Sequence, residues 1–433
     1  MKCIGILRET KSKWERRTPI LPDDIVDLIN GLPVSFCIQP SRTRIITDNI
    51  FKESGLKVDN NLQHCDILIG IKEVKSEEII NNKVYIFFSH TIKGQSYNMK
   101  MLKTILEKGC TLIDYERIAD AEGKRFIFFG YHAGIAGAID TLWAYGRRLE
   151  SENIPSPFQE INRAYTYTGI KEIEGHIQEL ASQIKSKGLT VSQRPLIFGI
   201  TGYGNVAQGV QRILGHLPMK WIRPDQIRIA DDDTHSVYGV VFKEQDMVET
   251  VNDQPFNLKE YYEKPEKYRS VFNRYLPYLS ILFNASYWDP RYPKHVTRTD
   301  IRKLFGNKKG DVKLKVIGDI SCDIEGGVEC TLKVTDPGNP VYVYHPDTGN
   351  AIDGIDGPGP VIMAVDILPA EIPLDSSVYF SSKLKEIIPY LVQANFNVPF
   401  QSLMLPPMIK NAVIVHQGKL APDYHYLEKY LCE

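Results

Sequence analysis

The sequence lacks the features that mark membrane, secreted and nucleic-acid-binding proteins. No stretch of the 433 residues approaches the roughly 18 uninterrupted apolar residues that a membrane helix needs. The formal net charge is −1, so there is no electrostatic reason to expect nucleic acid or an anionic membrane as a partner. The start, MKCIGILRET, enters a strand-like run without signal-peptide or transit-peptide character. We therefore expect a cytoplasmic protein.

Cysteines are few and scattered. The seven stand at positions 3, 37, 65, 110, 322, 330 and 432, and none forms a Cys-x-x-Cys pair. This pattern argues against a disulfide framework and against a structural zinc site. We predict reduced thiols and no metal. The sequence also has no internal repeat and no low-complexity tract.

Short apolar runs that alternate with amphipathic segments predict an α/β protein. In the first third these runs are CIGILRE (3–9), VSFCIQP (34–40), DILIGIKE (66–73), VYIFFSH (84–90) and TLIDYE (111–116). Near-continuous apolar strands separated by helices are typical of parallel sheets covered on both faces. GYHAGIAGAIDTLWAYGRRL (130–149) predicts a helix whose early Gly and Ala residues permit close packing. IKEIEGHIQELASQIKSKG predicts a helix with Ile173, Ile177, Leu180 and Ile184 on one face.

The length and the order of these patterns predict two Rossmann-like domains with parallel sheets and an active-site cleft between them. We expect a discontinuous substrate-binding domain, residues 1–133 and 360–433, and an inserted dinucleotide-binding domain, residues 134–359. Within the latter, the charged and Tyr-rich residues 225–275 have the composition of an insertion.

The residues that end the apolar runs of the first domain are the first candidate site. In an open parallel sheet, ligands bind beyond the carboxyl ends of the strands. A single polar residue at a strand end is usually only the first loop residue, but several ends here supply acid–base and cationic groups. They are Arg8, Glu9, Lys72, Glu73, His90, Lys93, Gln95 and Glu116.

A second signal is the G-x-G-x-x-A motif of Gly202, Gly204, Asn205 and Val206, which ends at Ala207. It follows the strand-like PLIFGIT and precedes the amphipathic NVAQGVQRIL, which is the context that a dinucleotide site requires. Glycine lets the backbone approach a pyrophosphate, and the following helix offers its N-terminus to the anion. A simple strand-to-helix turn is the alternative.

The residue that selects NAD or NADP is expected about 20 positions after the motif, at the end of the next strand. The count leads to Lys220-Trp221-Ile222 and then Arg223, which would receive a 2′-phosphate. Asp231 is the rival candidate and would favour NAD. We expect NADPH, with NADH as the alternative. A dinucleotide domain together with a site of Lys, His, Glu and Arg indicates hydride transfer to or from a small acid.

Several longer segments resemble one family. They are ILRETKSKWERRTPILP, GIKEV, FFSHTIKGQ, LIDYERIADAEGKRFIFFG, HAGIAGA, FNASYW, GDISCDIEGGVE and VDILPAEIP, in that order. They resemble the lysine–2-oxoglutarate reductase domain of α-aminoadipic semialdehyde synthase. They are more distantly similar to the fungal lysine-forming saccharopine dehydrogenases and to the alanine dehydrogenase/transhydrogenase superfamily.

The resemblance implies an enzyme that condenses the ε-amine of lysine with 2-oxoglutarate and reduces the imine to saccharopine with NAD(P)H. It implies that Lys72 and His90 are the acid–base pair. The implied substrate contacts are Arg17, Lys93, Gln95, Glu116, Arg125 and, from the second domain, Asp319. In that reading Arg17 and Arg125 hold carboxylates of 2-oxoglutarate and Glu116 attracts the lysine amine.

The chain departs from the bifunctional proteins of this family because it ends at LEKYLCE and has no mitochondrial presequence. We therefore expect it to hand saccharopine to a separate saccharopine-cleaving dehydrogenase. Two other functions stay open at this point. One is a related amino-acid or opine dehydrogenase that uses a different amine, and the other is a catalytically silent sensor of nucleotide or amino acid.

Overall fold

The computed structural model describes residues 1–190, 194–306 and 312–431. The chain forms two compact units, residues 1–128 with 373–433 and residues 129–372. The second boundary lies later than predicted. Residues 361–363 form a strand of the second unit's sheet, so the chain returns to the first unit only after them.

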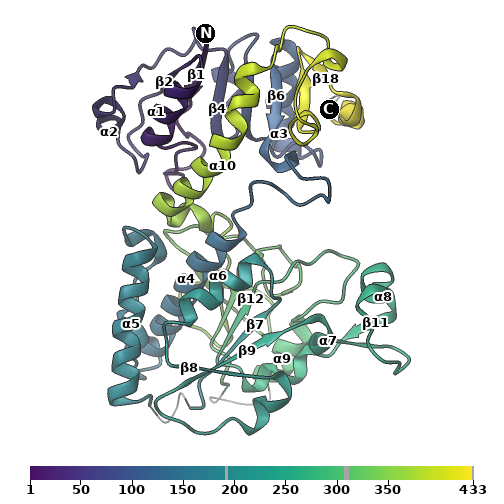
Figure 1. Cartoon of the computed structure of the whole chain (residues 1–433). Helices are drawn as coiled ribbons and strands as arrows, with labels where there is room; N and C mark the ends of the chain where they lie inside the picture. Colours follow the sequence, from purple (N-terminus) through teal and green to yellow (C-terminus); the bar gives the residue numbers. More distant parts are fainter. Residues whose placement is uncertain (191–193, 307–311, 432–433) are drawn as a thin grey trace. The chain divides into compact units, whose positions relative to one another are not determined.

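The first unit is built on one mostly parallel sheet (Figure 1), in the order β18-β17-β6-β5-β4-β1-β2-β3. Its strands are β1 (Lys2–Ile6), β2 (Val34–Ile38), β3 (Lys57–Val58), β4 (Ile67–Lys72), β5 (Val84–Phe88), β6 (Thr111–Asp114), β17 (Val413–His416) and β18 (Lys419–Leu420). Five of them confirm the five apolar runs. The edge strands β17 and β18 are antiparallel to their neighbours and were not predicted.

The helices of the first unit are α1 (Pro22–Gly31), α2 (Asp48–Glu53), α3 (Ser96–Glu107), α10 (Pro373–Gln393), α11 (Pro407–Lys410) and α12 (Glu428–Leu431). In α3, Met101, Leu102 and Ile105 are buried at helical spacing. The helix ends before Gly109, whose φ of 65° suits glycine.

The second unit holds another mostly parallel sheet, in the order β15-β14-β16-β13-β12-β7-β9-β8. Its strands are β7 (Ile197–Thr201), β8 (Met219–Ile222), β9 (Val237–Phe242), β12 (Ile281–Asn284), β13 (Val316–Asp319), β14 (Val341–Tyr344), β15 (Ala351–Asp353) and β16 (Val361–Met363). Strands β10 (Val248–Thr250) and β11 (Tyr268–Ser270) form a separate antiparallel pair. Because β9 belongs to the main sheet, residues 225–275 as a whole are not an insertion.

The helices of the second unit are α4 (Gly130–Ser151), α5 (Ile170–Lys187), α6 (Asn205–Leu214), α7 (Glu244–Met247), α8 (Leu258–Glu263) and α9 (Arg298–Gly306). The four predicted apolar residues of α5 are buried, and such a side chain stabilises the fold by about 1.5–3 kcal/mol relative to an exposed one. Glycines bring α4 and α6 into close contact: a Cβ at Gly134 would lie 2.0 Å from Val206 O. This contact holds the helix that begins at the glycine motif.

A pair of buried carboxyl groups lies in the second unit. Asp140 of α4 and Glu371, at the end of a 3-10 turn (Leu368–Glu371), lie side by side. Burial raises the pKa of Asp140 to about 6, and burial together with the neighbouring Asp140 raises the pKa of Glu371 well above its usual value. The pair therefore shares a proton at neutral pH.

This pair makes stability depend on pH. A carboxyl whose folded pKa is raised stabilises the folded state fully below its unfolded pKa of about 4 and loses this contribution as pH rises through the folded value. We expect Glu371→Gln, which supplies a permanent N–H donor to Asp140, to be more stable than the natural chain at pH 8 and nearly equal to it at pH 4. Urea unfolding at both values measures the difference. An equal gain at both would contradict the shared proton.

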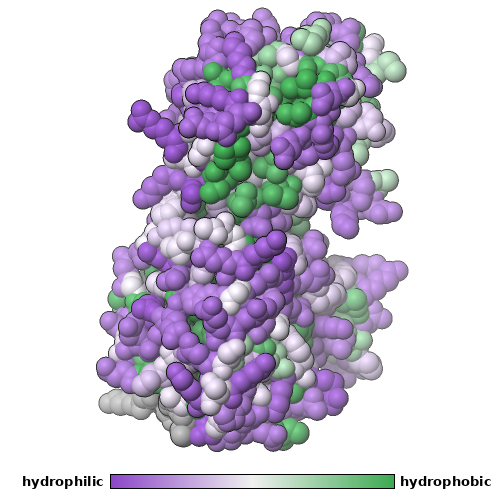
Figure 2. Space-filling view, turned by 60° about the vertical axis from the view of Figure 1, so that its left-hand side comes forward, coloured by the Kyte–Doolittle hydropathy of each residue, from purple (hydrophilic) through white to green (hydrophobic). Residues whose placement is uncertain are grey.

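Most of the face drawn in Figure 2 is hydrophilic, with hydrophobic residues in smaller groups. None of the helices in the described ranges combines the length and apolar composition that crossing a membrane requires. Six cysteines of these ranges are free thiols, and Cys432 lies outside the described residues. Cys3, His64 and Cys65 bring their ligand atoms within 4.8 Å of one another, but a structural zinc site takes four protein ligands.

Candidate active site

The predicted acid–base residues of the first unit lie at one edge of its sheet. Lys72 is the last residue of β4, His90 follows β5 by two positions, and Glu116 follows β6 by two positions. The three strands are adjacent and parallel, with Lys72 level with Phe88 and Phe87 level with Asp114. Their carboxyl ends therefore present these side chains at the same edge, where open α/β sheets bind ligands.

Lys72 lies in a charged, largely dry environment. Burial lowers the pKa of its ammonium, and the nearby positive charge of Arg17 lowers it further, whereas Glu15 opposes both. The backbone around it is held by Glu9, whose carboxylate accepts hydrogen bonds from Ile71 N (2.7 Å) and Lys72 N (3.0 Å). Burial and the charge of Glu15 raise the pKa of Glu9 to about 7. A lysine with a lowered pKa can act as a base near neutrality.

Arg17 is fixed by a residue that the sequence did not single out. Its Nε and Nη2 donate to the two carboxylate oxygens of Glu15 at 2.7 and 2.6 Å, and the side chains are 5% and 3% exposed. A substrate carboxylate would have to compete with Glu15 for these nitrogens. The geometry favours a different part for Arg17, which is to hold its charge beside Lys72 and so keep the lysine pKa low.

His90 is oriented by Glu73. Its Nδ1 lies 3.1 Å from Glu73 Oε2, and Glu73 Oε1 accepts from Asn98 Nδ2 at 3.3 Å and from Lys11 Nζ. Burial would raise the pKa of Glu73, but the hydrogen bonds from His90 and Lys11 outweigh it and lower the pKa to about 2. A permanent carboxylate on Nδ1 leaves Nε2 as the atom that exchanges protons with a substrate.

The loop after β5 has an unusual backbone. His90 has a φ of 50° and Gly94 one of 66°, a conformation that few residues other than glycine adopt. Gln95 shapes this loop, because its Oε1 accepts from Lys93 N at 3.0 Å. At the start of the loop, Ser89 Oγ donates to the buried carboxylate of Asp114, whose pKa burial raises to about 6.

Glu116 and Arg125 were assigned to different ligands, and the structure pairs them. Arg125 Nη2 lies 2.6 Å from Glu116 Oε1, and the two side chains are 46% and 16% exposed. Glu116 is held in addition through its backbone, because Glu116 N donates to Asp114 Oδ1 at 2.8 Å. A surface pair of this kind is worth little energy and exchanges partners readily.

The glycine motif of the second unit has the conformation that a dinucleotide loop needs. It joins β7 to α6, and Gly202 has a φ of 80° with its N donating to Phe242 O at 2.9 Å. A Cβ at Gly202 would lie 3.1 Å from Ser286 Cα, whereas one at Gly204 would meet open space among the described residues. Asn205 and Val206 begin α6, whose first N–H groups have no intrahelical acceptors and suit a phosphate.

Asp319 lies at the same edge of the sheet as this loop, at the end of β13. It is buried, and its carboxylate accepts from Asn284 Nδ2 (2.8 Å), Cys322 N (3.2 Å) and Thr331 Oγ1. Burial raises its pKa to about 6. Asn284 is in turn level with Thr201, the residue before Gly202, and accepts from its hydroxyl at 2.7 Å. Through Asn284, Asp319 is therefore linked by hydrogen bonds to Thr201, which precedes the glycine loop.

The count to Arg223 leads past a strand that is not the neighbour of β7. Arg223 directly follows β8, which is separated from β7 by β9, and its side chain is 72% exposed and paired with Asp225. Asp231 is not in a strand either. The strand beside β7 is β9, which comes later in the chain, and it is followed by Lys243 and Glu244. The order of β8 and β9 in the chain differs from their order in the sheet, and counting residues along the chain cannot reveal this difference.

Lys243 and Glu244 surround the side chain of the motif's Tyr203. Lys243 Nζ lies 5.6 Å from the centre of the Tyr203 ring, and Tyr203 Oη donates to Glu244 Oε1 at 3.4 Å. Tyr262 Oη donates to the same oxygen at 2.7 Å. These residues occupy the place that the general rule assigns to the adenosine ribose.

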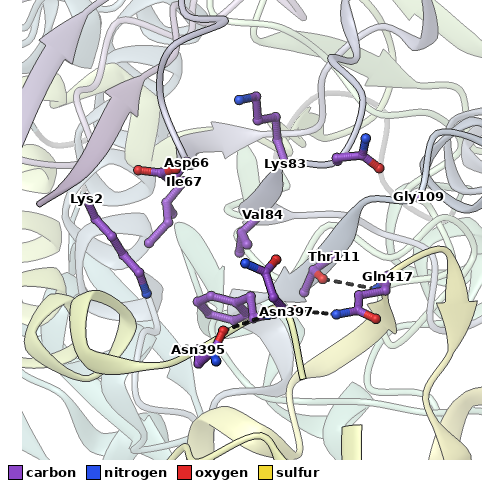
Figure 3. A pocket seen from close by; sticks show the side chains of 12 residues that line it. Lys2, Asp66, Ile67, Lys83, Val84, Gly109, Thr111, Asn395, Asn397 and Gln417 are labelled. Atoms are coloured by element: carbon purple, nitrogen blue, oxygen red, sulfur yellow. Dashed lines mark hydrogen bonds between the residues drawn. The ribbon is translucent and has the colours of Figure 1, made fainter. Parts of the chain in front are cut away.

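A pocket of the first unit lies at the other edge of its sheet. Its volume is about 400 Å³, and it lies beside the amino ends of the strands. Figure 3 shows that Lys2, Asp66, Lys83 and Gln417 are among the residues that line it. The predicted catalytic and substrate residues do not line it. Because ligands of such sheets bind at the carboxyl ends, we place the site at the edge of Lys72 and His90.

Comparison with known proteins agrees with this geometry. Residues 5–136 match the family model of the alanine dehydrogenase/PNT N-terminal domain. α-Aminoadipic semialdehyde synthase of Arabidopsis thaliana is 34% identical over 446 residues, which take in 98% of this chain and 41% of that protein. The NAD(+), L-lysine-forming saccharopine dehydrogenase of Neurospora crassa is 24% identical, with 90% of each chain covered. The chain spans less than half the length of the synthases that it matches.

Among solved structures, an L-alanine dehydrogenase covers 99% of both chains with a TM-score of 0.63 and 15% identity, and so has the same fold. The predicted α/β class is thereby confirmed. Over 98% of its length the chain is thus similar to part of α-aminoadipic semialdehyde synthase, and it is more distantly similar to the lysine-forming saccharopine dehydrogenases.

Proposed function

We propose that the protein condenses the ε-amine of L-lysine with 2-oxoglutarate and reduces the imine to saccharopine. The observation that carries this proposal is the pairing of a buried lysine of lowered pKa with a histidine anchored by a carboxylate, at one sheet edge. Reductive condensation needs two such groups, because protons leave the amine and another must reach the departing oxygen. The names of the relatives support lysine as the amine.

The chain's residues carry out the proton steps. Lys72 accepts a proton from the ammonium of lysine, and the free amine attacks the keto carbon of 2-oxoglutarate. His90 Nε2 protonates the oxygen of the resulting carbinolamine, so that the C–O bond breaks, water leaves and an iminium forms. A reduced nicotinamide supplies the hydride that converts the iminium carbon to the secondary amine of saccharopine. The proposed acid–base groups lie on the first unit and the dinucleotide motif on the second.

Glu73 and the arginines set the charges for these steps. The Glu73 carboxylate holds His90 Nδ1 and so orients Nε2 for the proton transfer to the departing oxygen. Arg17 keeps the pKa of Lys72 low, so that a fraction of it is neutral and basic. Arg125, the more exposed arginine, is better placed to exchange Glu116 for a carboxylate of 2-oxoglutarate. That exchange would free Glu116 to attract the lysine ammonium.

Initial rates test the proposed function. With lysine and 2-oxoglutarate we expect the reduced nicotinamide to be consumed and saccharopine to accumulate. Ammonia, alanine and other amines, offered with the same keto acid, are expected to support rates at least about a hundredfold lower, because selection between amines here depends on charged groups that small amines leave unpaired. Turnover with ammonia or alanine and none with lysine would overturn the proposal.

NADPH is the proposed reductant. The motif's glycines fit a pyrophosphate, and the supporting observation for a 2′-phosphate is Lys243, which lies against Tyr203 beside the adenosine position. Glu244 already accepts from two tyrosine hydroxyls, so it is less suited to bind a ribose diol. Lys243 thus replaces Arg223 as the proposed phosphate ligand.

Replacing Lys243 by alanine is expected to raise the KM for NADPH about tenfold, which is the effect of losing one charged hydrogen bond, and to leave the KM for NADH nearly unchanged. Arg223→Ala, the matched control on β8, is expected to change neither. Steady-state rates with each cofactor measure both variants. A loss of NADPH affinity in Arg223→Ala alone would show that β8 and not β9 faces the ribose.

A further inference from the structure

The last described residues of the chain lie against the loop that carries His90. Residues 422–431, here called the C-terminal brace, comprise a 3-10 turn (Pro422–Leu427) and α12. Tyr426 of the brace donates its hydroxyl to Ile92 O at 2.6 Å. Ile92 is the central residue of the loop of residues 89–95, so this bond fixes the middle of the loop.

A second tyrosine of the brace packs on the same loop. A Cβ built on Gly94 would lie 2.6 Å from Cδ2, Cε2 and Cζ of Tyr430, so the ring covers the bare backbone of the glycine. Tyr430 also lines a cavity of about 370 Å³ together with Met99 and Lys103 of α3. The ring therefore sits between the loop and the helix that follows it.

The brace reaches the loop of Glu116 as well. Arg117, the next residue, donates from Nε to Tyr424 Oη at 3.1 Å, and its guanidinium lies 5.9 Å from the centre of the Tyr424 ring. Tyr424 is buried and donates its own proton to Asn411 O at 2.6 Å. One segment of ten residues thus contacts the loop of His90 and the residue that follows Glu116, through three tyrosines.

We propose that the C-terminal brace positions the active-site loops, and that Tyr426 is the positioning residue for the loop of residues 89–95. The proposal rests on the proposed function for its catalytic part. The loop contains two left-handed residues, His90 and Gly94, and such a backbone persists only where its surroundings hold it. The Tyr426 hydroxyl and the Tyr430 ring stabilise this backbone through Ile92 and Gly94, and neither is a proposed substrate contact.

Tyr426→Phe tests the proposal because it removes one hydroxyl and keeps the ring. Three amides report on the loop, since Ser89, Lys93 and Gly94 donate to Asp114, Gln95 and Thr91. We expect hydrogen exchange of the peptide spanning residues 89–95 to accelerate about fivefold, the effect of losing one hydrogen bond. Exchange elsewhere in the unit and the Tm are expected to stay as in the natural chain. Tyr390→Phe, on the half-exposed face of α10, is the control and should leave the loop unchanged.

The same variants are then compared in the lysine assay. Tyr426→Phe is expected to lower kcat about fivefold with the KM for NADPH unchanged, because only the loop is loosened. Unchanged exchange in residues 89–95, or exchange accelerated throughout the unit, overturns the brace. If the natural chain does not turn over lysine, the proposed function fails, whereas the exchange experiment still decides whether the brace holds the loop.

Discussion

Lys72→Met is expected to lower kcat by at least about tenfold, and by as much as 10⁴, the range for loss of an acid–base group. Methionine keeps most of the length and the apolar stem of lysine, so the strand end should pack as before. Because the charge of Lys72 is disfavoured by burial and by Arg17, its removal should not cost stability. Steady-state kinetics with lysine and 2-oxoglutarate, together with the Tm, measure both effects.

Lys75→Met is the matched control, since Lys75 is exposed and only three positions away. A companion variant addresses His90. His90→Asn is preferable to alanine, because asparagine tolerates the positive φ of this position better. It should lower kcat by a similar factor, because the group proposed to protonate the departing oxygen is lost. Near-normal turnover in both Lys72→Met and His90→Asn would refute the acid–base assignment.

Gly202→Ala is expected to weaken dinucleotide binding at least about tenfold. Two effects add. The φ of 80° is strained for any residue with a Cβ, and that Cβ would lie 3.1 Å from Ser286 Cα and 3.2 Å from Ala285 O. The backbone would have to move away from the position in which its N–H groups meet the pyrophosphate. Titration of NADPH fluorescence measures the Kd directly.

Gly175→Ala serves as the control for this variant. Gly175 lies inside α5, and a Cβ there meets open space among the described residues. Alanine is favoured over glycine within a helix, so the control should bind NADPH normally and be slightly more stable. Unaltered affinity in Gly202→Ala would mean that the dinucleotide does not bind at this turn.

The sequence allowed the sheets to be predicted well, because their central strands are apolar throughout. Runs such as DILIGIKE and VYIFFSH are apolar at successive positions, which is typical of strands buried on both faces. The structure confirms them as β4 and β5. Strands β3 and β18 have two residues each and are too short to show a pattern. The second domain boundary was placed too early because VIM (361–363) is short and follows the Gly- and Pro-rich DGIDGPGP, and only its pairing with β13 and β14 shows that it belongs to the second unit.

Which residues share an edge was predictable, but their partners were not. The carboxyl ends of parallel strands must lie together, and this places Lys72, His90 and Glu116 without any knowledge of side-chain packing. The ion pairs Arg17–Glu15 and Arg125–Glu116 depend on loop conformations that no periodicity encodes. Glu73 was predicted as a strand-end residue. Its hydrogen bond with His90, however, depends on the left-handed backbone at position 90.

The order of β8 and β9 is the clearest limit of counting along the sequence. A rule for the usual Rossmann connection assumes that the next strand in the chain is the next in the sheet. Here β9 enters between β7 and β8, so the expected ribose contact moves from Arg223 to Lys243.

One isotope experiment tests the central claim most directly, namely that this chain joins an amine to a keto acid and reduces the product. The natural chain is incubated with ε-¹⁵N-lysine, 2-oxoglutarate and NADPH deuterated in the transferable position, and the products are weighed by mass spectrometry. The account predicts saccharopine that carries the ¹⁵N and one deuterium. Deuterated glutamate formed only when ammonia is added, or unlabelled products throughout, would contradict it.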